Sequence, residues 1–232
     1  MDGANFIIDC SRGARRPSDD QAFTLVKPEP YIRYYESLAA TFQPRGLLEL
    51  GVFQGGSYVL LDKIFRPERM SAVEISPVPV EPLMRHIERT PGRSVHFGTS
   101  QSDRDALRAI VADDLGGQLD LVVDDASHMY GHSRAAFEVL FPLLAPNGFY
   151  IIEDWAWAHE PHYQGDDARN RDQPALTSLL FEQILLLGST HLIAEIRVRR
   201  PFYVIRKSGR ETAADLDVWS LVANRGRDWP RV

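Results

Sequence analysis

Acidic side chains follow two apolar segments of the sequence, at the point where each segment ends. Asp124 and Asp125 come after one segment, and Glu153 and Asp154 come after the next. If these segments are neighbouring strands of a parallel sheet, their carboxyl ends share the edge at which such sheets bind ligands. Three carboxylates close together repel one another unless a cation lies among them, and hard oxygen ligands suit Mg²⁺ or Mn²⁺. The pattern predicts a metal site made of Asp125, Glu153 and Asp154.

A histidine stands three residues after the first of these predicted ligands. His128 is close enough to Asp125 along the chain to reach a substrate hydroxyl held beside the metal. An aliphatic hydroxyl is a poor nucleophile, but a divalent cation stabilises its alkoxide and an imidazole can accept its proton. We therefore predict that His128 is a general base. A lone histidine is more often structural, and His132, one helical turn later, is interpreted as structural or substrate-contacting.

A glycine-containing turn joins an earlier apolar segment to a helical one. Its glycines, Gly51 and Gly55, permit close approach of a ligand, and the helix that begins near Ser57 offers free N–H groups. The dinucleotide-binding pattern needs a third glycine where this chain has Phe53. S-adenosyl-L-methionine has no phosphate, and its ammonium group suits an acid such as Glu49. The turn thus favours S-adenosylmethionine over a dinucleotide.

The ends of the next two predicted strands supply groups for the rest of this cofactor. Glu74 can accept hydrogen bonds from both ribose hydroxyls, and the small polar turn at 98–103 suits the edge of adenine. Ordinary solvated turns are the alternative interpretation, but three successive strand ends fit one ligand. The predicted cofactor-binding residues are Glu49, Gly51, Gly55, Ser57, Glu74, Ile75, Ser100, Gln101 and Asp124.

Short apolar runs alternate with helical patterns through most of the chain. The expected strands are 47–50, 70–75, 94–97, 119–123 and 149–152, and the expected helices are 31–42, 56–65, 81–89, 103–112 and 130–144. Because these strands are apolar on both faces, the pattern predicts a parallel sheet with helices on both sides. This arrangement is a doubly wound α/β fold.

The C-terminal part departs from this repeat. A helix over 174–187 precedes two strand-like runs, 192–198 and 202–206, which a tight connection at 199–201 joins. These runs should pair as an antiparallel hairpin. The complete prediction is a mostly parallel, seven-stranded, Rossmann-like sheet of the class I methyltransferase type that ends in this hairpin.

Between the last predicted metal ligand and Pro174 lies a long loop rich in aromatic and polar side chains. Loops of this length inside a compact domain are usually functional. Aromatic faces beside hydrogen-bonding groups suit a sugar ring, which is apolar on its faces and polar at its rim. The side chains in question are Trp155, Trp157, His159, His162 and Tyr163.

The composition narrows the class of protein. The chain has 232 residues and a formal charge of −6, which gives no basic footprint for nucleic acid. With Cys10 as its single cysteine it forms no intrachain disulfide, and with no signal-peptide pattern or membrane-inserting stretch we expect a cytoplasmic protein. Residues 46–232 are predicted to form the methyltransferase domain. Residues 1–45 are predicted to be an arm and helix that contact the substrate or another subunit, with a mobile polar segment at 11–22.

From about Leu47 to Trp155 the chain resembles the macrocin O-methyltransferase family. The matching segments are 48–52 with 55–57, 98–103, 123–128 and 152–154. The resemblance implies a Mg²⁺-dependent, S-adenosylmethionine-dependent O-methyltransferase that acts on sugar hydroxyls and forms homodimers or larger homo-oligomers. It also implies metal ligation by Asp125, Glu153 and Asp154, with His128 as the base. Ala126 stands where the family often has glycine, and Thr99 replaces a more usual aspartate.

Three alternatives compete with this assignment. A catechol-type O-methyltransferase also binds a metal at these strand ends, but typically with a lysine base and an Asp-Asn pair. A nicotinamide oxidoreductase is disfavoured by Phe53 and by the terminal hairpin. A non-catalytic S-adenosylmethionine-binding partner protein would have no need of His128 together with the acidic groups.

Overall fold

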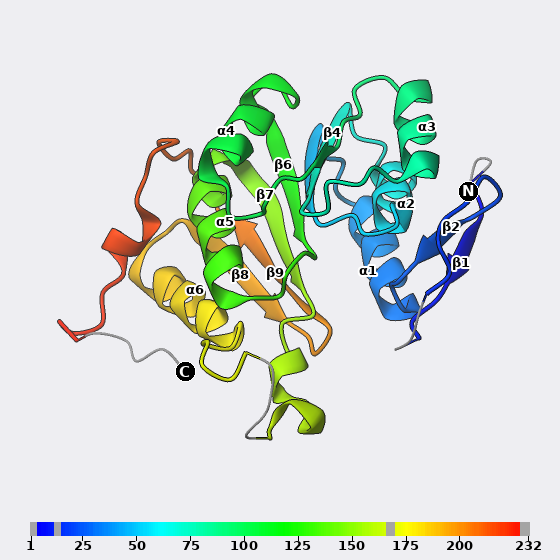
Figure 1. Cartoon of the computed structure of the whole chain (residues 1–232). Helices are drawn as coiled ribbons and strands as arrows, with labels where there is room; N and C mark the ends of the chain where they lie inside the picture. The colour runs from blue at the N-terminus through cyan, green and yellow to red at the C-terminus, as the bar shows by residue number, and fades with distance from the viewer. Residues whose placement is uncertain (1–3, 12–14, 166–169, 228–232) are drawn as a thin grey trace.

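Seven strands form one sheet in the order β5-β4-β3-β6-β7-β9-β8 (Figure 1). The computed structural model describes residues 4–11, 15–165 and 170–227. The strands are β3 (Gly46–Leu50), β4 (Arg69–Glu74), β5 (His96–Phe97), β6 (Leu119–Asp124), β7 (Leu144–Glu153), β8 (Ile193–Val198) and β9 (Phe202–Lys207). The first five are parallel to one another, and β9 is antiparallel to both β7 and β8. The predicted class I methyltransferase fold with a C-terminal antiparallel hairpin is confirmed.

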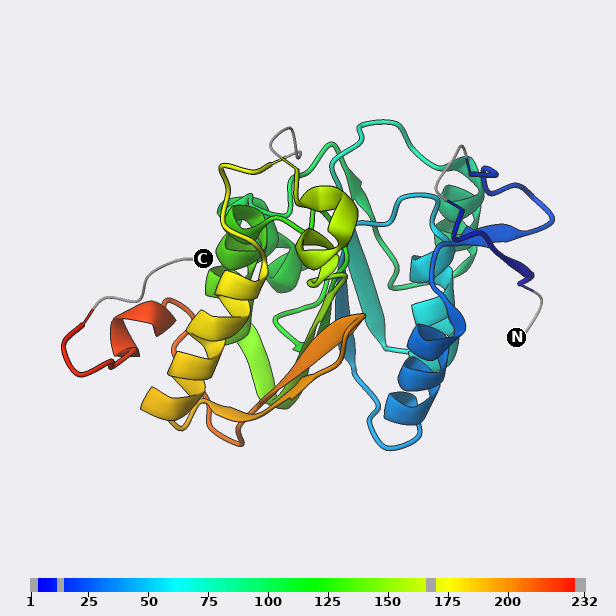
Figure 2. The same ribbon diagram turned by 90° about the horizontal axis from the view of Figure 1, so that it is seen from below.

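Alternating strand residues divide the core into two layers. Leu47 and Val123 face one layer of helices, whereas Leu48 and Val122 face the other, because successive side chains of a strand point to opposite faces. Figures 1 and 2 show these two layers on either side of the sheet. One layer contains α1 (Glu29–Ala39), α2 (Gly56–Phe65) and α3 (Glu81–Arg89), and the other contains α4 (Arg104–Asp113), α5 (Tyr130–Leu143) and α6 (Thr177–Ser189).

Two short strands near the N-terminus were not predicted. β1 (Phe6–Ile8) pairs in parallel with β2 (Phe23–Leu25), beside α2 (Figure 1). The polar segment between them was predicted to be mobile, and one of its described residues, Ser18, contacts the glycine turn. Ser18 is buried and its hydroxyl donates to the carbonyl of Gln54 at 2.6 Å.

The chain after β2 passes close to the beginning of α2. A Cβ atom at Gly56 would lie 2.1 Å from the carbonyl oxygen of Thr24, so only glycine permits this crossing. The crossing directs the chain toward the carboxyl end of the sheet just before α1, where Pro28 is the N-cap residue. As a result, the segment around Lys27, which is far from β6 and β7 in the sequence, enters the region of the predicted reaction site.

Short 3₁₀ helices occupy part of the loop that follows β7. These are η1 (Trp157–His159) and η2 (Pro161–Tyr163), and a third, η3 (Val218–Leu221), packs near α6. Figure 2 shows the segment after β7 lying at the end of the sheet. Among the described residues, the helices are too short or too polar to cross a lipid bilayer.

Candidate active site

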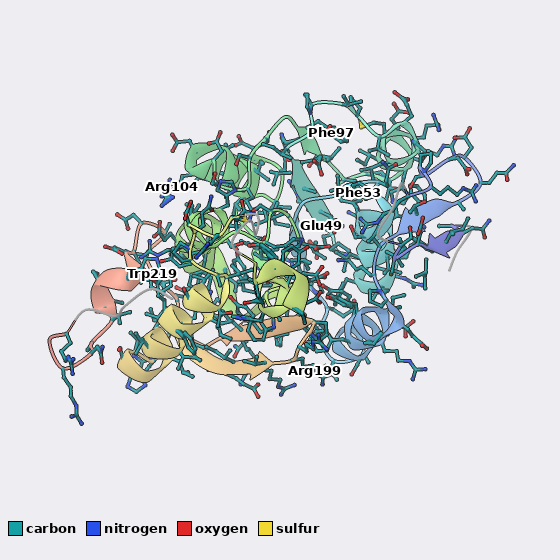
Figure 3. The ribbon with its side chains drawn as sticks, turned by 60° about the horizontal axis from the view of Figure 1, so that its bottom comes forward. Glu49, Phe53, Phe97, Arg104, Arg199 and Trp219 are labelled. Atoms are coloured by element: carbon teal, nitrogen blue, oxygen red, sulfur yellow. The ribbon has the colours of Figure 1, made fainter. Side chains whose placement is uncertain are left out.

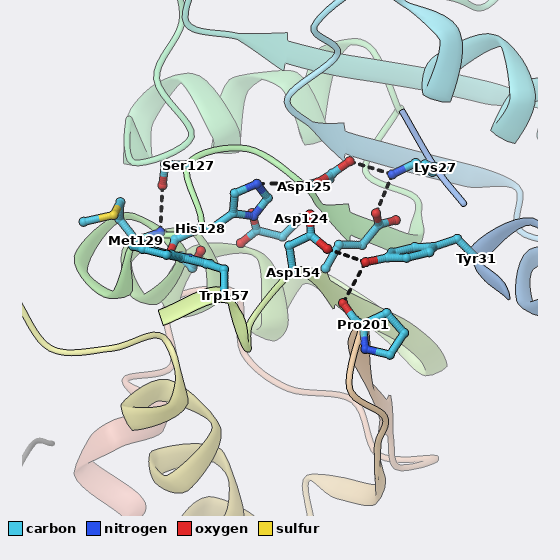
Figure 4. A network of polar contacts seen from close by, with 12 residues as sticks. Lys27, Tyr31, Asp124, Asp125, Ser127, His128, Met129, Asp154, Trp157 and Pro201 are labelled. Atoms are coloured by element: carbon cyan, nitrogen blue, oxygen red, sulfur yellow. Dashed lines mark hydrogen bonds and ion pairs between the residues drawn. The ribbon is translucent and has the colours of Figure 1, made fainter. Parts of the chain in front are cut away.

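The carboxyl ends of β6 and β7 lie side by side because Asp124 is opposite Ile152 in the parallel ladder. Three groups meet just beyond these ends: Asp125, His128 and Asp154 each offer a ligand atom, and the three atoms lie within 4.8 Å of one another. His128 Nε2 is 3.8 Å from Asp125 Oδ1 (Figure 4). All three side chains are exposed or partly exposed, so a ligand can reach them.

The backbone at two of these residues has an unusual conformation. His128 has a φ of 55° and Asp154 a φ of 50°, in the left-handed region that costs free energy for residues other than glycine. Hydrogen bonds hold both residues in place: Trp157 Nε1 donates to the carbonyl of His128 at 3.1 Å, and Asp154 donates its amide to Pro201 at 2.7 Å. The loops are therefore fixed in the conformation that brings the two side chains together.

Glu153, predicted to share a metal with the two aspartates, is held differently. It is the last residue of β7, only 1% exposed, and its carboxylate accepts hydrogen bonds from Lys27 and from the hydroxyl of Tyr35. The group that can surround an ion in the described part of the chain contains His128 and the two aspartates, without Glu153.

Lys27 lies between two of the carboxylates. Its Nζ donates to Asp125 Oδ2 at 2.6 Å and to Glu153 Oε2 at 2.5 Å, and the residue is 1% exposed. Burial lowers the pKa of Lys27, but the charges of Asp125 and Glu153 outweigh burial and raise its pKa above the usual value. The ammonium group is therefore a permanent positive charge at the inner side of the site.

Helix α1 supplies two further contacts to the carboxylates of this site. The hydroxyl of Tyr31 donates to Asp154 and lies 3.0 Å from the carbonyl of Pro201 (Figure 4). Tyr35 donates to Glu153 from one turn further along the helix. For both tyrosines burial raises the pKa, and the neighbouring carboxylates raise it further, so each hydroxyl keeps its proton as a donor.

A pocket opens on the side of this site that faces β3 and β4. Its lining residues are Gly51, Phe53, Val73, Glu74, Ile75, Thr99, Ser100, Gln101, Asp125, Ala126, Ser127 and His132. Five predicted cofactor contacts are among them, on the ends of three neighbouring strands. His132, assigned from sequence a structural or substrate-contacting role, also lines this pocket.

Two residues of this pocket shape the turn after β3. Glu74 accepts hydrogen bonds from the amides of Val52 at 3.1 Å and Phe53 at 2.9 Å. Gly51 has a φ of 86°, and a Cβ atom there would lie 2.6 Å from the carbonyl oxygen of Asp125 and 2.7 Å from Cα of Ala126. The glycine therefore brings the β3 turn against the loop that carries Asp125.

The remaining predicted cofactor residues lie behind this lining. Glu49 is fully buried (Figure 3), and neither of its carboxylate oxygens has a hydrogen-bond partner of normal geometry among the described residues. Burial raises the pKa of Glu49 to about 8, against the opposing effects of Lys27 and Ser57. Burial likewise raises the pKa of Asp124 to about 6, and Gln101 donates to it at 3.0 Å. Gly55 precedes α2 as its N-cap.

Comparison with known proteins shows which proteins this chain is similar to. The family described as a methyltransferase domain matches residues 48–155. The 8-demethyl-8-alpha-L-rhamnosyl tetracenomycin-C 2'-O-methyltransferase of Streptomyces olivaceus is 33% identical over 184 residues, which are 74% of this chain and 44% of that protein. Demethylmacrocin O-methyltransferase of Streptomyces fradiae is 37% identical over 91 residues, 39% of this chain and 22% of that protein. Over these residues the chain is similar to the macrocin O-methyltransferase family.

A solved structure shares this fold. MycE methyltransferase from the mycinamycin biosynthetic pathway, in complex with Mg, SAH and mycinamycin VI, aligns with a TM-score of 0.57 at 24% identity. The alignment covers 78% of this chain and 49% of that chain. The chain thus spans about half the length of this neighbour, and 44% of the Streptomyces olivaceus relative.

A second pocket lies on the other side of His128. Its lining residues are His128, Met129, Trp157, Ala158, His159, Tyr163, Gln164, Gly165, Asn170, Arg171, Gln173, Pro174, Ala175 and Leu176. Trp157 and Tyr163 pack edge to face, with ring centroids 4.7 Å apart. Trp155 instead donates its Nε1 proton to the carbonyl of Arg199 at 2.7 Å. The side chain of His162 lies outside the described residues.

Sequence reasoning did not find the three residues that α1 and its N-terminal flank bring to this site. Tyr31 and Tyr35 are spaced by four residues, which places them on one side of α1, whereas Lys27 lies just before the helix. Lys27 is also one of only three lysines in the chain. The spacing was a usable signal, because a stripe of proton donors on an otherwise apolar helix face requires acceptors opposite it.

Proposed function

We propose that this chain transfers the methyl group of S-adenosyl-L-methionine to a hydroxyl of a sugar or glycoside in a Mg²⁺-dependent reaction. The observation that carries the proposal is the convergence of Asp125, His128 and Asp154 within 4.8 Å between two pockets. Asp125 lines the pocket on the β3 side, and His128 lines the pocket under the loop after β7. A donor in the first pocket and an acceptor in the second would therefore meet at these three residues.

The described residues fit both small molecules. The buried, unpartnered carboxylate of Glu49 suits the ammonium group of S-adenosylmethionine, because an opposite charge stabilises its ionised form. Asp125 and Asp154 supply the carboxylate oxygens that Mg²⁺ prefers, with an open side for water or an acceptor hydroxyl. When bound, this ion would stabilise the negative charge that develops on the acceptor oxygen.

His128 would act as the general base. As the acceptor oxygen forms a bond to the methyl carbon, the sulfonium–carbon bond breaks and the hydroxyl proton passes to His128 Nε2. Trp157 holds the backbone of this histidine through its carbonyl, and Nε2 lies 3.8 Å from Asp125 Oδ1, beside the proposed metal site. Fixing the base in this way removes the entropic cost of orienting it during the reaction.

The acceptor class rests on the relatives and on the second pocket. The Streptomyces olivaceus relative is named for methylation of a rhamnosyl group, and a relative in Micromonospora griseorubida is named mycinamicin VI 2''-O-methyltransferase. The faces of Trp157 and Tyr163 beside polar groups of the same pocket suit a sugar ring. A catechol-type reaction is disfavoured because Lys27, the lysine at this site, is protonated and bound to two carboxylates, and so cannot accept a proton.

Release of S-adenosylhomocysteine tests the proposal directly. The purified chain would be incubated with a panel of sugars, glycosides and catechols, with Mg²⁺ and with EDTA. We expect turnover on a glycoside that depends on the metal. Turnover confined to catechols would show that the acceptor is a catechol rather than a sugar. Undiminished turnover in EDTA would refute the metal mechanism. If S-adenosylmethionine binds and none of the panel is methylated, the proposed acceptor class is wrong.

A further inference from the structure

The two oxygens of Asp125 face different partners. Oδ2 accepts a hydrogen bond from Lys27 at 2.6 Å, whereas Oδ1 points toward His128, 3.8 Å from its Nε2. Lys27 also binds Glu153 Oε2 at 2.5 Å, and Tyr35 binds the other oxygen of Glu153. Both oxygens of Glu153 are therefore occupied by donors from α1 and its N-terminal flank, whereas Asp125 Oδ1 accepts no hydrogen bond from Lys27.

The geometry points to Lys27 as a positioning residue that serves as the fixed counter-ion of Glu153 and confines the divalent cation to Asp154 and the Oδ1 side of Asp125. This inference rests on the proposed function, since it concerns the metal of that reaction. It assigns the two adjacent acids at the end of β7 to different cations: Glu153 to an internal ammonium and Asp154 to an exchangeable metal ion.

Burial explains why these two acids differ. Glu153 is 1% exposed, and an ionised carboxylate at such a position needs a permanent partner, because desolvation is costly whenever the partner leaves. Asp154 is exposed, so water can solvate it when no metal is bound. A metal ion that used Glu153 would have to displace Lys27, whose ammonium group would then be buried without an opposite charge.

The chain on both sides of Lys27 keeps the ammonium group in place. Upstream, β2 crosses the beginning of α2 at Gly56, where even one methyl group would collide with Thr24. Downstream, Pro28 precedes α1, which packs its buried tyrosines against the sheet. Lys27 thus enters the site from a fixed segment, as a positioning residue must.

Binding of Mn²⁺ to the whole chain, measured by electron paramagnetic resonance, tests this assignment without relying on turnover. We expect Glu153→Gln to change the Mn²⁺ dissociation constant by no more than about threefold, and Asp154→Asn to raise it about tenfold or more, as loss of a ligand should. Lys27→Met should lower the dissociation constant about tenfold, because it leaves two carboxylates without their positive charge. Lys63→Met, at a lysine on α2, is the matched control and should leave it unchanged.

Either single variant leaves a buried charge without its partner and could fail to fold, so the double variant Lys27→Met/Glu153→Gln is measured as well. It removes one charge of each sign, and its Mn²⁺ dissociation constant should return to within about threefold of the wild-type value. Equal weakening by Glu153→Gln and Asp154→Asn would overturn the inference while leaving the proposed function intact. A wild-type chain that binds S-adenosylmethionine but no Mn²⁺ would refute the metal mechanism, and the inference with it.

Discussion

A buried lysine lies at each of the two ends of the central strands, and different kinds of partner stabilise the two side chains. At the carboxyl edge of β6 and β7, Lys27 lies between the carboxylates of Asp125 and Glu153. At the opposite end of the strands, Lys207 Nζ donates to the carbonyls of Pro142 at 2.9 Å and Leu144 at 2.5 Å, and to the hydroxyl of Thr212 at 2.6 Å. The first lysine neutralises charge, and the second completes hydrogen bonds at the end of α5.

This difference indicates that the surroundings of Lys27 serve the proposed reaction, whereas those of Lys207 serve stability. Around Lys27, open oxygens of Asp125 and Asp154 and the ring of His128 retain the capacity to bind something else. Around Lys207, the partners are neutral oxygens at the end of a helix, whose dipole favours a cation there. Substitutions at the carboxyl edge should therefore reduce turnover more than stability, and those at the opposite edge should do the reverse.

The largest effect on turnover is expected from Asp125→Asn. This change removes a metal ligand and one partner of Lys27, so methyl transfer should fall to background while S-adenosylmethionine still binds. The matched control is Asp120→Asn on the same strand, where the carboxylate accepts the amides of Arg45 at 2.8 Å and Gly46 at 2.9 Å at the opposite edge. That variant should lose about 1 kcal/mol of unfolding free energy and keep its turnover. Equal losses of turnover in both variants would contradict the comparison.

His128→Ala should reduce the rate of methyl transfer roughly 10²–10⁴-fold, the usual contribution of a general base. The Michaelis constant for S-adenosylmethionine should change little, since the histidine lines the other pocket. His191→Ala, at an exposed residue preceding β8 on the opposite edge, serves as the control. Steady-state kinetics of both variants would measure this, and a wild-type rate in His128→Ala would remove the residue from the proposed role.

Trp157→Phe is expected to reduce turnover by about tenfold, because it keeps an aromatic ring beside Tyr163 but loses the hydrogen bond to the carbonyl of His128. Trp155→Phe loses a hydrogen bond of the same kind to Arg199 and should have a smaller effect. The two variants would be compared with the same acceptor at saturating S-adenosylmethionine. If Trp155→Phe reduces turnover more than Trp157→Phe does, the loop affects turnover through its contact with Arg199 rather than through His128.

Lys207→Met should alter stability and leave turnover unchanged. Burial lowers the pKa of Lys207 from 10.5 to about 8, with Glu211 opposing only in part. The unfolded chain therefore holds more protons than the folded chain between these two pH values, and this residue makes the unfolding free energy rise as pH increases from about 8 to 10.5. Urea unfolding at pH values across that range should show a smaller rise in the variant than in the wild type. An identical rise in both proteins would show that the lysine titrates normally.

The fold was predictable because apolar periodicity alone determines the strands and helices. The segments at 56–65 and 81–89 begin and end as α2 and α3 do, and the hairpin of β8 and β9 followed from two strand-like runs with a tight connection. The three-residue strands β1 and β2 were missed, since so short a segment carries no measurable period.

The site was predictable only where it follows strand ends. Asp125, His128 and Asp154 come together because β6 and β7 are neighbours, which the sequence order already indicated. The partner of Glu153 is 126 residues away along the chain, and its position depends on how the N-terminal segment crosses α2. Such a contact has no local signature, so a triad of acids was a natural prediction from the sequence.

The close approach of Gly51 to the loop that begins at Asp125 has a consequence for how this protein can diverge. No side chain larger than hydrogen fits at position 51 unless the loop at 125–126 moves away, carrying His128 with it. A larger side chain at position 51 therefore requires a compensating shift of this loop, whereas the segment around Trp157 and Tyr163 lies outside this contact. Under the proposed function, substitutions that change the acceptor could therefore accumulate around Trp157 and Tyr163 without disturbing the turns at Gly51 and Asp125.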